Sequence, residues 1–204
     1  MNIVELISDK LTASIKKNDK ASIVVSGGSS LLKIFEDLSN KDICWSKVQV
    51  TLVDDRLVDA RSDESNQKLI NEKFLINNAK NAKFFPLNQE LIIKKVFMIP
   101  FNIVLLGMGE DGHFASLFPE MINNHDAFDI NADNKILNTH SIGNPFVPRI
   151  TMNLSLILRS EIIFLIVKGN FKQNILSKAL EDGSYPIHYL IKNRVKNIYI
   201  KKIN

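Results

Sequence analysis

Apolar runs that resemble buried strands alternate along this chain with stretches that have the periodicity of amphipathic helices. The strand-like runs cover residues 21–25, 48–53, 101–106, 162–167 and 197–201. Between them, apolar residues recur every three or four positions, which is typical of helices with one buried face. Strands that alternate with helices predict an α/β fold with a mainly parallel sheet flanked by helices.

Four helices are expected, an opening helix before the first strand and three between later strands. Ser29 or Ser30 is a candidate N-cap for the second helix, and Ser65 is a candidate for the third. Gly183 is expected to end the last one. The apolar faces that define the four helices fall within residues 3–15, 31–38, 69–74 and 175–180. Residues 149–154 alternate with a period of two, which predicts a further, half-exposed strand that joins the sheet.

Length and composition favour one self-contained domain. A chain of 204 residues can bury a sufficient core, so we expect a single domain over residues 1–204. The only cysteine, Cys44, cannot form an internal disulfide and fits a reducing compartment. No apolar run approaches the ~20 residues that span a bilayer, and Glu5 interrupts the layout of a signal peptide. We therefore expect a cytoplasmic protein without a membrane partner.

The formal net charge of +4 raises the question of nucleic acid binding. The lysines, however, alternate with acidic residues, as in residues 33–37, and this pattern is typical of a solvated surface. We expect no nucleic acid partner. The single cysteine and four histidines also lack the short spacing of metal ligands, so no metal site is expected.

Polar and glycine-rich segments follow four of the expected strands. In a parallel sheet, ligands bind beyond the carboxyl ends of the strands. Because these ends lie at one edge, we expect the four segments to form one polar site. They are residues 26–30, 54–56, 107–113 and 168–172.

The first segment has the composition of an anion-binding loop. Gly27 and Gly28 let the backbone approach an oxyanion, and Ser29 and Ser30 add hydroxyl donors at the start of a helix. No Gly-Lys-Ser/Thr follows, so this is not a Walker A loop. The alternative is a tight turn whose serine only caps the helix.

Three cationic side chains are candidate ligands of a substrate anion. Arg149 offers a bidentate fork and Lys172 a mobile charge, although either could be an ordinary surface charge. Cations are disfavoured at a helix start, so a bound anion would explain Lys172. Arg56 could stabilise developing negative charge, with Asp54 or Asp55 fixing its guanidinium. The alternative for this triplet is a local surface ion pair.

The turn over residues 107–113 carries the group best suited to proton transfer. Histidine titrates near neutral pH, so His113 could activate water as a general base, and Asp111 could orient its ring. The alternative is a packed histidine with no chemical role. Gly107, Gly109 and Gly112 also match G-x-G-x-x-G, but the adjacent acids Glu110 and Asp111 would repel a pyrophosphate. We therefore reject a dinucleotide site.

These motifs together resemble one known family. Residues 107–119, GMGEDGHFASLFP, are similar to the 6-phosphogluconolactonase signature G-M-G-x-D-G-H-x-A-S-L-F-P. The resemblance extends to four weaker motifs in the same order. They are SGGS at 26–29, DDRLV at 54–58 with SN at 65–66, PRIT at 148–151, and GNFK at 169–172.

The resemblance implies a Rossmann-like fold shared with glucosamine-6-phosphate deaminases and ribose-5-phosphate isomerases. It also implies hydrolysis of 6-phospho-D-glucono-1,5-lactone to 6-phosphogluconate in the oxidative pentose phosphate pathway, without a cofactor. The partner would be this phosphosugar lactone, and both a monomer and a homodimer remain open.

The same resemblance implies roles for individual residues. His113 is then the general base, oriented by Asp111, and Arg56 contacts the lactone or its anionic intermediate. The residues expected to bind the substrate or its phosphate are Gly27, Gly28, Ser29, Ser30, Asp55, Gly109, Arg149 and Lys172.

The sequence departs from the family pattern in several places. Asp55 stands where glutamate is usual, and Ser30-Leu31 replaces the usual Thr-Pro. The Lys-Pro-rich run before Arg149 is reduced to residues 143–148, and residues 87–100 look trimmed. Two other functions remain open. An isomerase or deaminase of amino-sugar phosphates usually continues I-A-F-N-E-P after the histidine, and a phosphosugar sensor would keep the pocket without turnover.

Overall fold

The computed structural model describes residues 2–193 and 197–203. It confirms the predicted α/β fold, because a six-stranded sheet with entirely parallel pairing forms the centre of the molecule. In spatial order its strands are β4 (Lys83–Phe85), β2 (Val48–Leu52), β1 (Ala21–Val25), β5 (Phe101–Gly107), β8 (Ser160–Lys168) and β9 (Asn197–Ile203).

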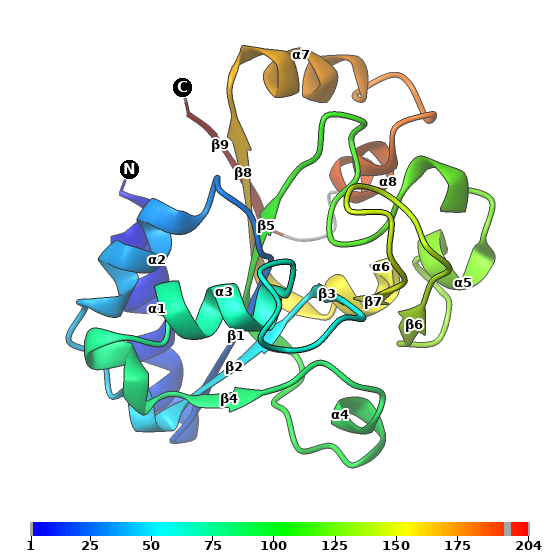
Figure 1. Cartoon of the computed structure of the whole chain (residues 1–204). Helices are drawn as coiled ribbons and strands as arrows, with labels where there is room; N and C mark the ends of the chain where they lie inside the picture. The colour runs from blue at the N-terminus through cyan, green and yellow to red at the C-terminus, as the bar shows by residue number, and fades with distance from the viewer. Residues whose placement is uncertain (1, 194–196, 204) are drawn as a thin grey trace.

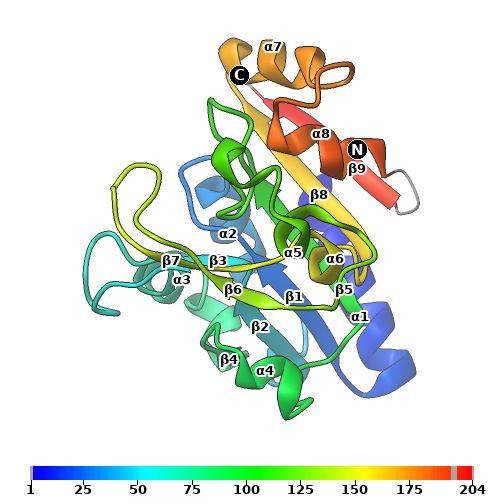
Figure 2. The same ribbon diagram turned by 90° about the vertical axis from the view of Figure 1, so that its right-hand side faces the viewer.

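Helices cover both faces of this sheet. Figures 1 and 2 show α1 and α2 on one face, with α5, α6 and a smaller sheet on the other. The helices are α1 (Ile3–Asn18), α2 (Leu32–Ser39), α3 (Asn66–Lys73), α4 (Glu90–Ile93), α5 (His125–Phe128), α6 (Leu154–Ile157), α7 (Asn170–Lys178) and α8 (Pro186–Lys192). Three short 3-10 helices, η1 (Trp45–Lys47), η2 (Asn77–Asn81) and η3 (Pro119–Met121), lie in the connections.

The helix ends agree only in part with the sequence pattern. Ser65 caps α3 as predicted, because its hydroxyl accepts the backbone N–H of Lys68 at 3.3 Å. The prediction for α2 was wrong: its N-cap is Leu31, without a side-chain hydrogen bond, so Ser29 and Ser30 are not caps. The end of α7 was also misplaced, since this helix stops at Lys178, before Gly183.

The strand predicted over residues 149–154 lies in a different sheet. It is shorter, as β7 (Arg149–Met152), and it pairs antiparallel with β3 (Asp54–Arg56) and β6 (Ile136–Asn138). We refer to these three strands as the small sheet. The small sheet packs beside the main one, so three of the four β7 residues are buried and the expected alternation does not appear.

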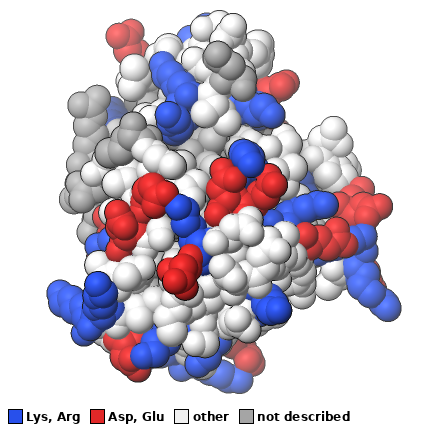
Figure 3. Space-filling view, turned by 90° about the vertical axis from the view of Figure 1, so that its left-hand side faces the viewer, with Lys and Arg blue, Asp and Glu red and all other residues white. Residues whose placement is uncertain are grey.

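The core lies around the central strands, and most charged side chains lie on the surface, with Asp54, Asp55 and Arg149 as buried exceptions. All five residues of β1 are buried, as expected for a parallel strand covered on both faces. Figure 3 shows lysine and arginine interspersed with aspartate and glutamate over one face of the molecule. Among the described residues, no helix has both the length and the apolar character needed to cross a bilayer.

Candidate active site

One polar cavity of about 240 Å³ lies at the carboxyl ends of the main-sheet strands. All four predicted strand-end segments contribute to its wall, and Arg149 of β7 contributes from the small sheet. The structure therefore brings together the segments that the sequence marked. The lining residues are Ser26, Gly27, Gly28, Ser29, Ser30, Asp54, Arg56, Asn66, Gly107, Met108, Gly109, His113, Phe114, Ala115, Arg149 and Lys172.

The loop after β1 brings its backbone close to the cavity. A Cβ on Gly27 would lie 2.0 Å from Oδ1 of Asn66, so only glycine allows this approach. Gly28 has a φ of +110°, which also favours glycine. The hydroxyl of Ser26 is buried without a hydrogen-bond partner. This loop therefore holds polar donors that the rest of the described protein does not fully use.

Arg56 projects from β3 and is only partly satisfied by the protein. Its Nη1 donates to the carbonyl oxygen of Glu64 at 2.6 Å and to Oδ1 of Asn66 at 3.1 Å. Its Nε is buried and has no hydrogen-bond partner. A buried, unpaired donor of a charged group is costly, which is consistent with a site built to receive an anion.

Arg149 lies directly opposite Arg56 in the β3–β7 pair. Its Nε and Nη2 donate to the carbonyl oxygens of Ile142 and Pro145 at 3.0 and 2.9 Å. Burial, followed by the positive charge of Arg56, lowers the pKa of Arg149. Facing like charges destabilise a strand pair, and an anion between them would offset this cost.

Lys172 completes the cationic side of the cavity from α7. No ion pair formed by the described residues involves Lys172, Arg56 or Arg149. Three cations without a carboxylate partner around one cavity create a positive potential, which attracts an anionic ligand.

Asp55 lies outside the cavity wall, in contrast to the expectation that it contacts substrate. Its carboxylate accepts the backbone N–H groups of Asn66 at 2.6 Å, Gln67 at 3.0 Å and Arg56 at 2.7 Å. Two of these donors belong to the first turn of α3, whose orphan N–H groups need acceptors. In this structure Asp55 anchors α3 to β3.

Asp54 lines the cavity. The sequence alone did not show whether Asp54 or Asp55 would lie beside Arg56 there. Ser116 donates its hydroxyl to Oδ2 of Asp54 at 2.6 Å. Burial raises the pKa of Asp54, although the Ser116 hydrogen bond and then the charge of Arg56 act in the opposite direction. The alternation of a strand, in which adjacent side chains point to opposite faces, separates Asp54 from Asp55.

His113 and Asp111 form a hydrogen-bonded pair at the cavity. Nδ1 of His113 lies 2.5 Å from Oδ1 of Asp111, which also accepts the His113 backbone N–H at 3.0 Å. Burial opposes ionisation of Asp111, but its hydrogen bond and charge interaction with His113 hold the pKa below the usual value. An ionised carboxylate can only accept, so a neutral imidazole in this position carries its hydrogen on Nδ1 and presents the lone pair of Nε2.

The glycines of this turn make room for the histidine. A Cβ on Gly109 would lie 2.1 Å from Cε1 and Nδ1 of His113. The N–H of Gly109 donates to the carbonyl oxygen of His113 at 2.8 Å, so it is not free for a substrate. No helix follows Gly112, since the described residues 113–118 form turns and isolated bridges. This agrees with the rejection of a dinucleotide site.

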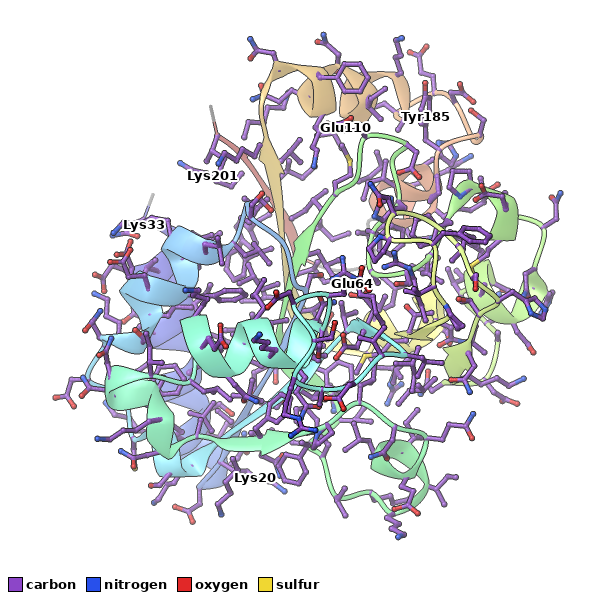
Figure 4. The ribbon with its side chains drawn as sticks, viewed as in Figure 1. Lys20, Lys33, Glu64, Glu110, Tyr185 and Lys201 are labelled. Carbon is purple, nitrogen blue, oxygen red and sulfur yellow. The ribbon has the colours of Figure 1, made fainter. Side chains whose placement is uncertain are left out.

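The start of α8 supports the same turn from outside the cavity. The carbonyl oxygen of Gly112 accepts the N–H of Ile187 at 2.9 Å. A Cβ on Gly112 would lie 3.1 Å from the ring of Tyr185, so the two residues are closely packed. Figure 4 shows Tyr185 near the loop that carries Glu110. The turn is therefore held by α8 as well as by β5.

Comparison with known proteins identifies the family. Residues 1–199 match the family of glucosamine-6-phosphate isomerases and 6-phosphogluconolactonases. The chain belongs to this family.

Several members of the family are similar over nearly the whole chain. The 6-phosphogluconolactonase of Helicobacter pylori strain J99 is 33% identical over 192 residues, which cover 89% of this chain and 82% of the relative. That of Mesorhizobium japonicum is 36% identical over 188 residues, covering 87% and 79%. A crystal structure of a 6-phosphogluconolactonase from Shewanella baltica has 34% identity and a TM-score of 0.87, covering 98% of this chain and 91% of its own.

Proposed function

We propose that this protein is a 6-phosphogluconolactonase, a hydrolase that opens 6-phospho-D-glucono-1,5-lactone to 6-phosphogluconate. The observation that carries the proposal is the pairing of His113 with Asp111 on the wall of a cavity that also holds three unpaired cations. A base and a cationic pocket are the two features that hydrolysis of a phosphorylated lactone requires. Membership of the family and the near-full-length similarity to several 6-phosphogluconolactonases support it.

In the proposed mechanism, His113 is the general base. As the oxygen of water forms a bond to the lactone carbonyl carbon, a proton passes from water to Nε2 of His113. The bond between that carbon and the ring oxygen then breaks, and the ring oxygen takes the proton back from the imidazolium. The product is the open-chain acid. Asp111 orients the ring and stabilises the imidazolium, a contribution that follows the logic of a base and its orienting carboxylate.

Arg56 is proposed to stabilise the carbonyl oxygen as it becomes negative. The basis is its partly unsatisfied guanidinium at the cavity wall. Preorganised donors aimed at developing charge are a major source of rate enhancement in acyl transfer. Because a lactone is already an activated ester, a positioned base worth about 10²–10⁴-fold and one such donor suffice without a covalent nucleophile.

The substrate phosphate is proposed to bind between the loop after β1 and the cations Arg149 and Lys172. Gly27, Gly28, Ser29 and Ser30 supply backbone and hydroxyl donors there. Holding the phosphate pins the sugar so that its carbonyl faces His113, and such positioning converts binding energy into rate. No cofactor takes part in this mechanism.

Amino-sugar-phosphate deamination is the nearest alternative within the family. The sequence after His113 reads Phe114-Ala115-Ser116-Leu117-Phe118-Pro119 and lacks the glutamate of the deaminase pattern. Phe118 stands at the position of that glutamate, and its ring stacks on His113. These residues favour the lactonase.

A paired assay tests the proposal. Purified protein is given freshly generated 6-phosphogluconolactone, and acid release is followed against the spontaneous rate; a parallel sample with glucosamine 6-phosphate is tested for ammonia. We expect lactone hydrolysis well above the spontaneous rate and no ammonia. Binding of 6-phosphogluconate without acceleration would instead support a sensor. We further propose that the protein acts in the cytoplasm, in keeping with its single, exposed cysteine.

A further inference from the structure

Phe118 lies between the proposed base and the loop held by Arg149. Its ring stacks on the imidazole of His113, with centroids 4.3 Å apart and planes inclined by 29°. Cζ of Arg149 lies 5.2 Å from the centroid of the same ring. Phe118 is itself only 4% exposed and is not part of the cavity wall. Its contacts thus reach two groups of the site although it touches no substrate.

We propose that Phe118 is a positioning residue that sets the plane of the His113 imidazole for proton transfer. The proposal deepens the lactonase function and rests on it. It assigns to Phe118 a role in turnover, and none in binding the phosphorylated substrate.

The geometry of His113 shows why a second constraint is needed. The one side-chain hydrogen bond that it forms with the described residues, from Nδ1 to Asp111, fixes the position of one ring atom. Rotation about that hydrogen bond would still swing Nε2, the atom proposed to take the proton. The backbone of Gly109 approaches the Cε1–Nδ1 edge, and Phe118 covers a face. The ring is held only when all three contacts are present.

The position of Phe118 is in turn determined by the loop before β7. Gly143 has a φ of +73°, and a Cβ there would lie 2.6 Å from Cζ of Phe118. Arg149 holds the same loop through the carbonyl oxygens of Ile142 and Pro145. Because packed side chains transmit displacement, a shift of this loop would move Phe118 and therefore the imidazole.

The first test compares Phe118→Leu with Phe128→Leu. Phe128 on α5 is equally buried, at 5% exposed, but its aromatic contacts are with Phe114 and Tyr189. We expect Phe118→Leu to lower kcat for the lactone about 10–100-fold with KM nearly unchanged. The reason is that displacing a catalytic group by about 1 Å can reduce the rate by about 10²-fold. Phe128→Leu should leave kcat and KM near the wild-type values. Thermal melts of both variants show whether each one is folded.

A second measurement does not depend on turnover. In wild type, the imidazole protons of His113 should show an upfield NMR shift from the ring current of Phe118, with the signal assigned through His113→Asn. The shift should disappear in Phe118→Leu and persist in Phe128→Leu. If Phe118→Leu does not fold, Gly143→Ala serves instead, because its methyl would displace the ring. Gly183→Ala is its control, since a Cβ at Gly183 meets nothing closer than 3.7 Å.

The outcomes separate the two proposals. An active wild type together with an unchanged kcat in Phe118→Leu would overturn the positioning role alone. An unshifted His113 signal in wild type would also overturn it. A folded wild type that does not accelerate lactone hydrolysis would overturn the proposed function. A ring-current shift in that same protein would show that Phe118 still stacks on His113.

Discussion

Arg56 and Arg149 occupy directly opposed positions in the β3–β7 pair, and no ion pair among the described residues neutralises either one. Cross-strand like charges reduce the stability of a sheet. Both guanidinium groups line the cavity, where an anionic ligand can neutralise them. Their mutual repulsion is a cost that a bound anionic substrate would reduce.

We therefore predict that the product, 6-phosphogluconate, raises the Tm of wild type, because a ligand that binds only the folded state stabilises it. Arg149→Met should weaken product binding by about 10–100-fold, the equivalent of one charge-assisted hydrogen bond of roughly 1.5–3 kcal/mol. Calorimetric titration gives the affinity and a thermal melt gives the shift. Gluconate without the phosphate should show no such difference between the two proteins, and equal loss of both ligands would contradict the assignment.

His113→Ala should lose most of the rate acceleration while still binding 6-phosphogluconate. The imidazole supplies the proton transfer, worth about 10²–10⁴-fold, but it is not among the groups proposed to hold the phosphate. Initial rates and calorimetry on the same preparation test both parts. His125→Ala is a suitable control, since this exposed side chain at the start of α5 pairs only with Asp129, the residue after that helix, among the described residues. A variant at residue 113 with unimpaired turnover would eliminate the general-base mechanism.

Asp111→Asn should lower kcat by at least tenfold with little change in KM. The amide can donate to Nδ1, which would favour the tautomer that carries its hydrogen on Nε2 and cannot accept a proton there. Steady-state kinetics with the lactone distinguish this from a binding defect. The adjacent Glu110→Gln removes a charge from the same turn without removing this hydrogen bond, and should behave like wild type. Similar losses in both variants would point to the local charge instead.

Asp54→Asn should change the dependence of stability on pH. Burial raises the pKa of Asp54, so the folded protein binds this proton more tightly than the unfolded chain does. The associated stability is present at low pH and is lost as the pH rises through the folded-state pKa. The neutral amide avoids this loss, so the variant should have a higher Tm than wild type at pH 8, with a difference that narrows toward pH 4. Melts across this range are the measurement, and a constant difference would contradict the prediction.

Asp55→Ala should destabilise the fold rather than only the chemistry. It leaves two N–H groups of α3 and that of Arg56 without their acceptor. We expect a loss of about 2–4 kcal/mol, which corresponds to a fall in Tm of roughly 5–15 °C in a chain of this size. Asp63→Ala, in the exposed loop nearby, removes only a surface ion pair with Lys68 and should cost under about 1 kcal/mol.

The sequence predicted five strands of the main sheet because its central strands are apolar, but it missed the three-residue edge strand β4. β1, β5 and β8 are mostly buried, so their apolar composition alone identified them as strands. The carboxyl ends of these strands necessarily share an edge, which is why the cavity could also be anticipated. The turn over residues 107–113 follows β5, and the histidine it carries indicated which group could transfer a proton.

The small sheet could not be predicted in the same way. β3 and β6 have only three residues each, too few for a period to be recognised. The register that places Arg56 opposite Arg149 depends on segments about ninety residues apart in the chain. That pairing also determines that Asp54 lines the cavity whereas Asp55 binds the start of α3. The contact of Phe118 with His113 depends on irregular turns, whose geometry a pattern of residue types does not predict.

The separation of the cavity between two sheets has an evolutionary consequence. The base comes from the turn after β5 of the main sheet, whereas Arg56 and Arg149 come from the small sheet. The two sheets are coupled, because only Val53 separates β2 from β3 and Phe118 contacts both His113 and Arg149. A mutation in the small sheet that alters phosphate binding can therefore also displace the base. A change of phosphorylated substrate would therefore require matching changes on both sheets.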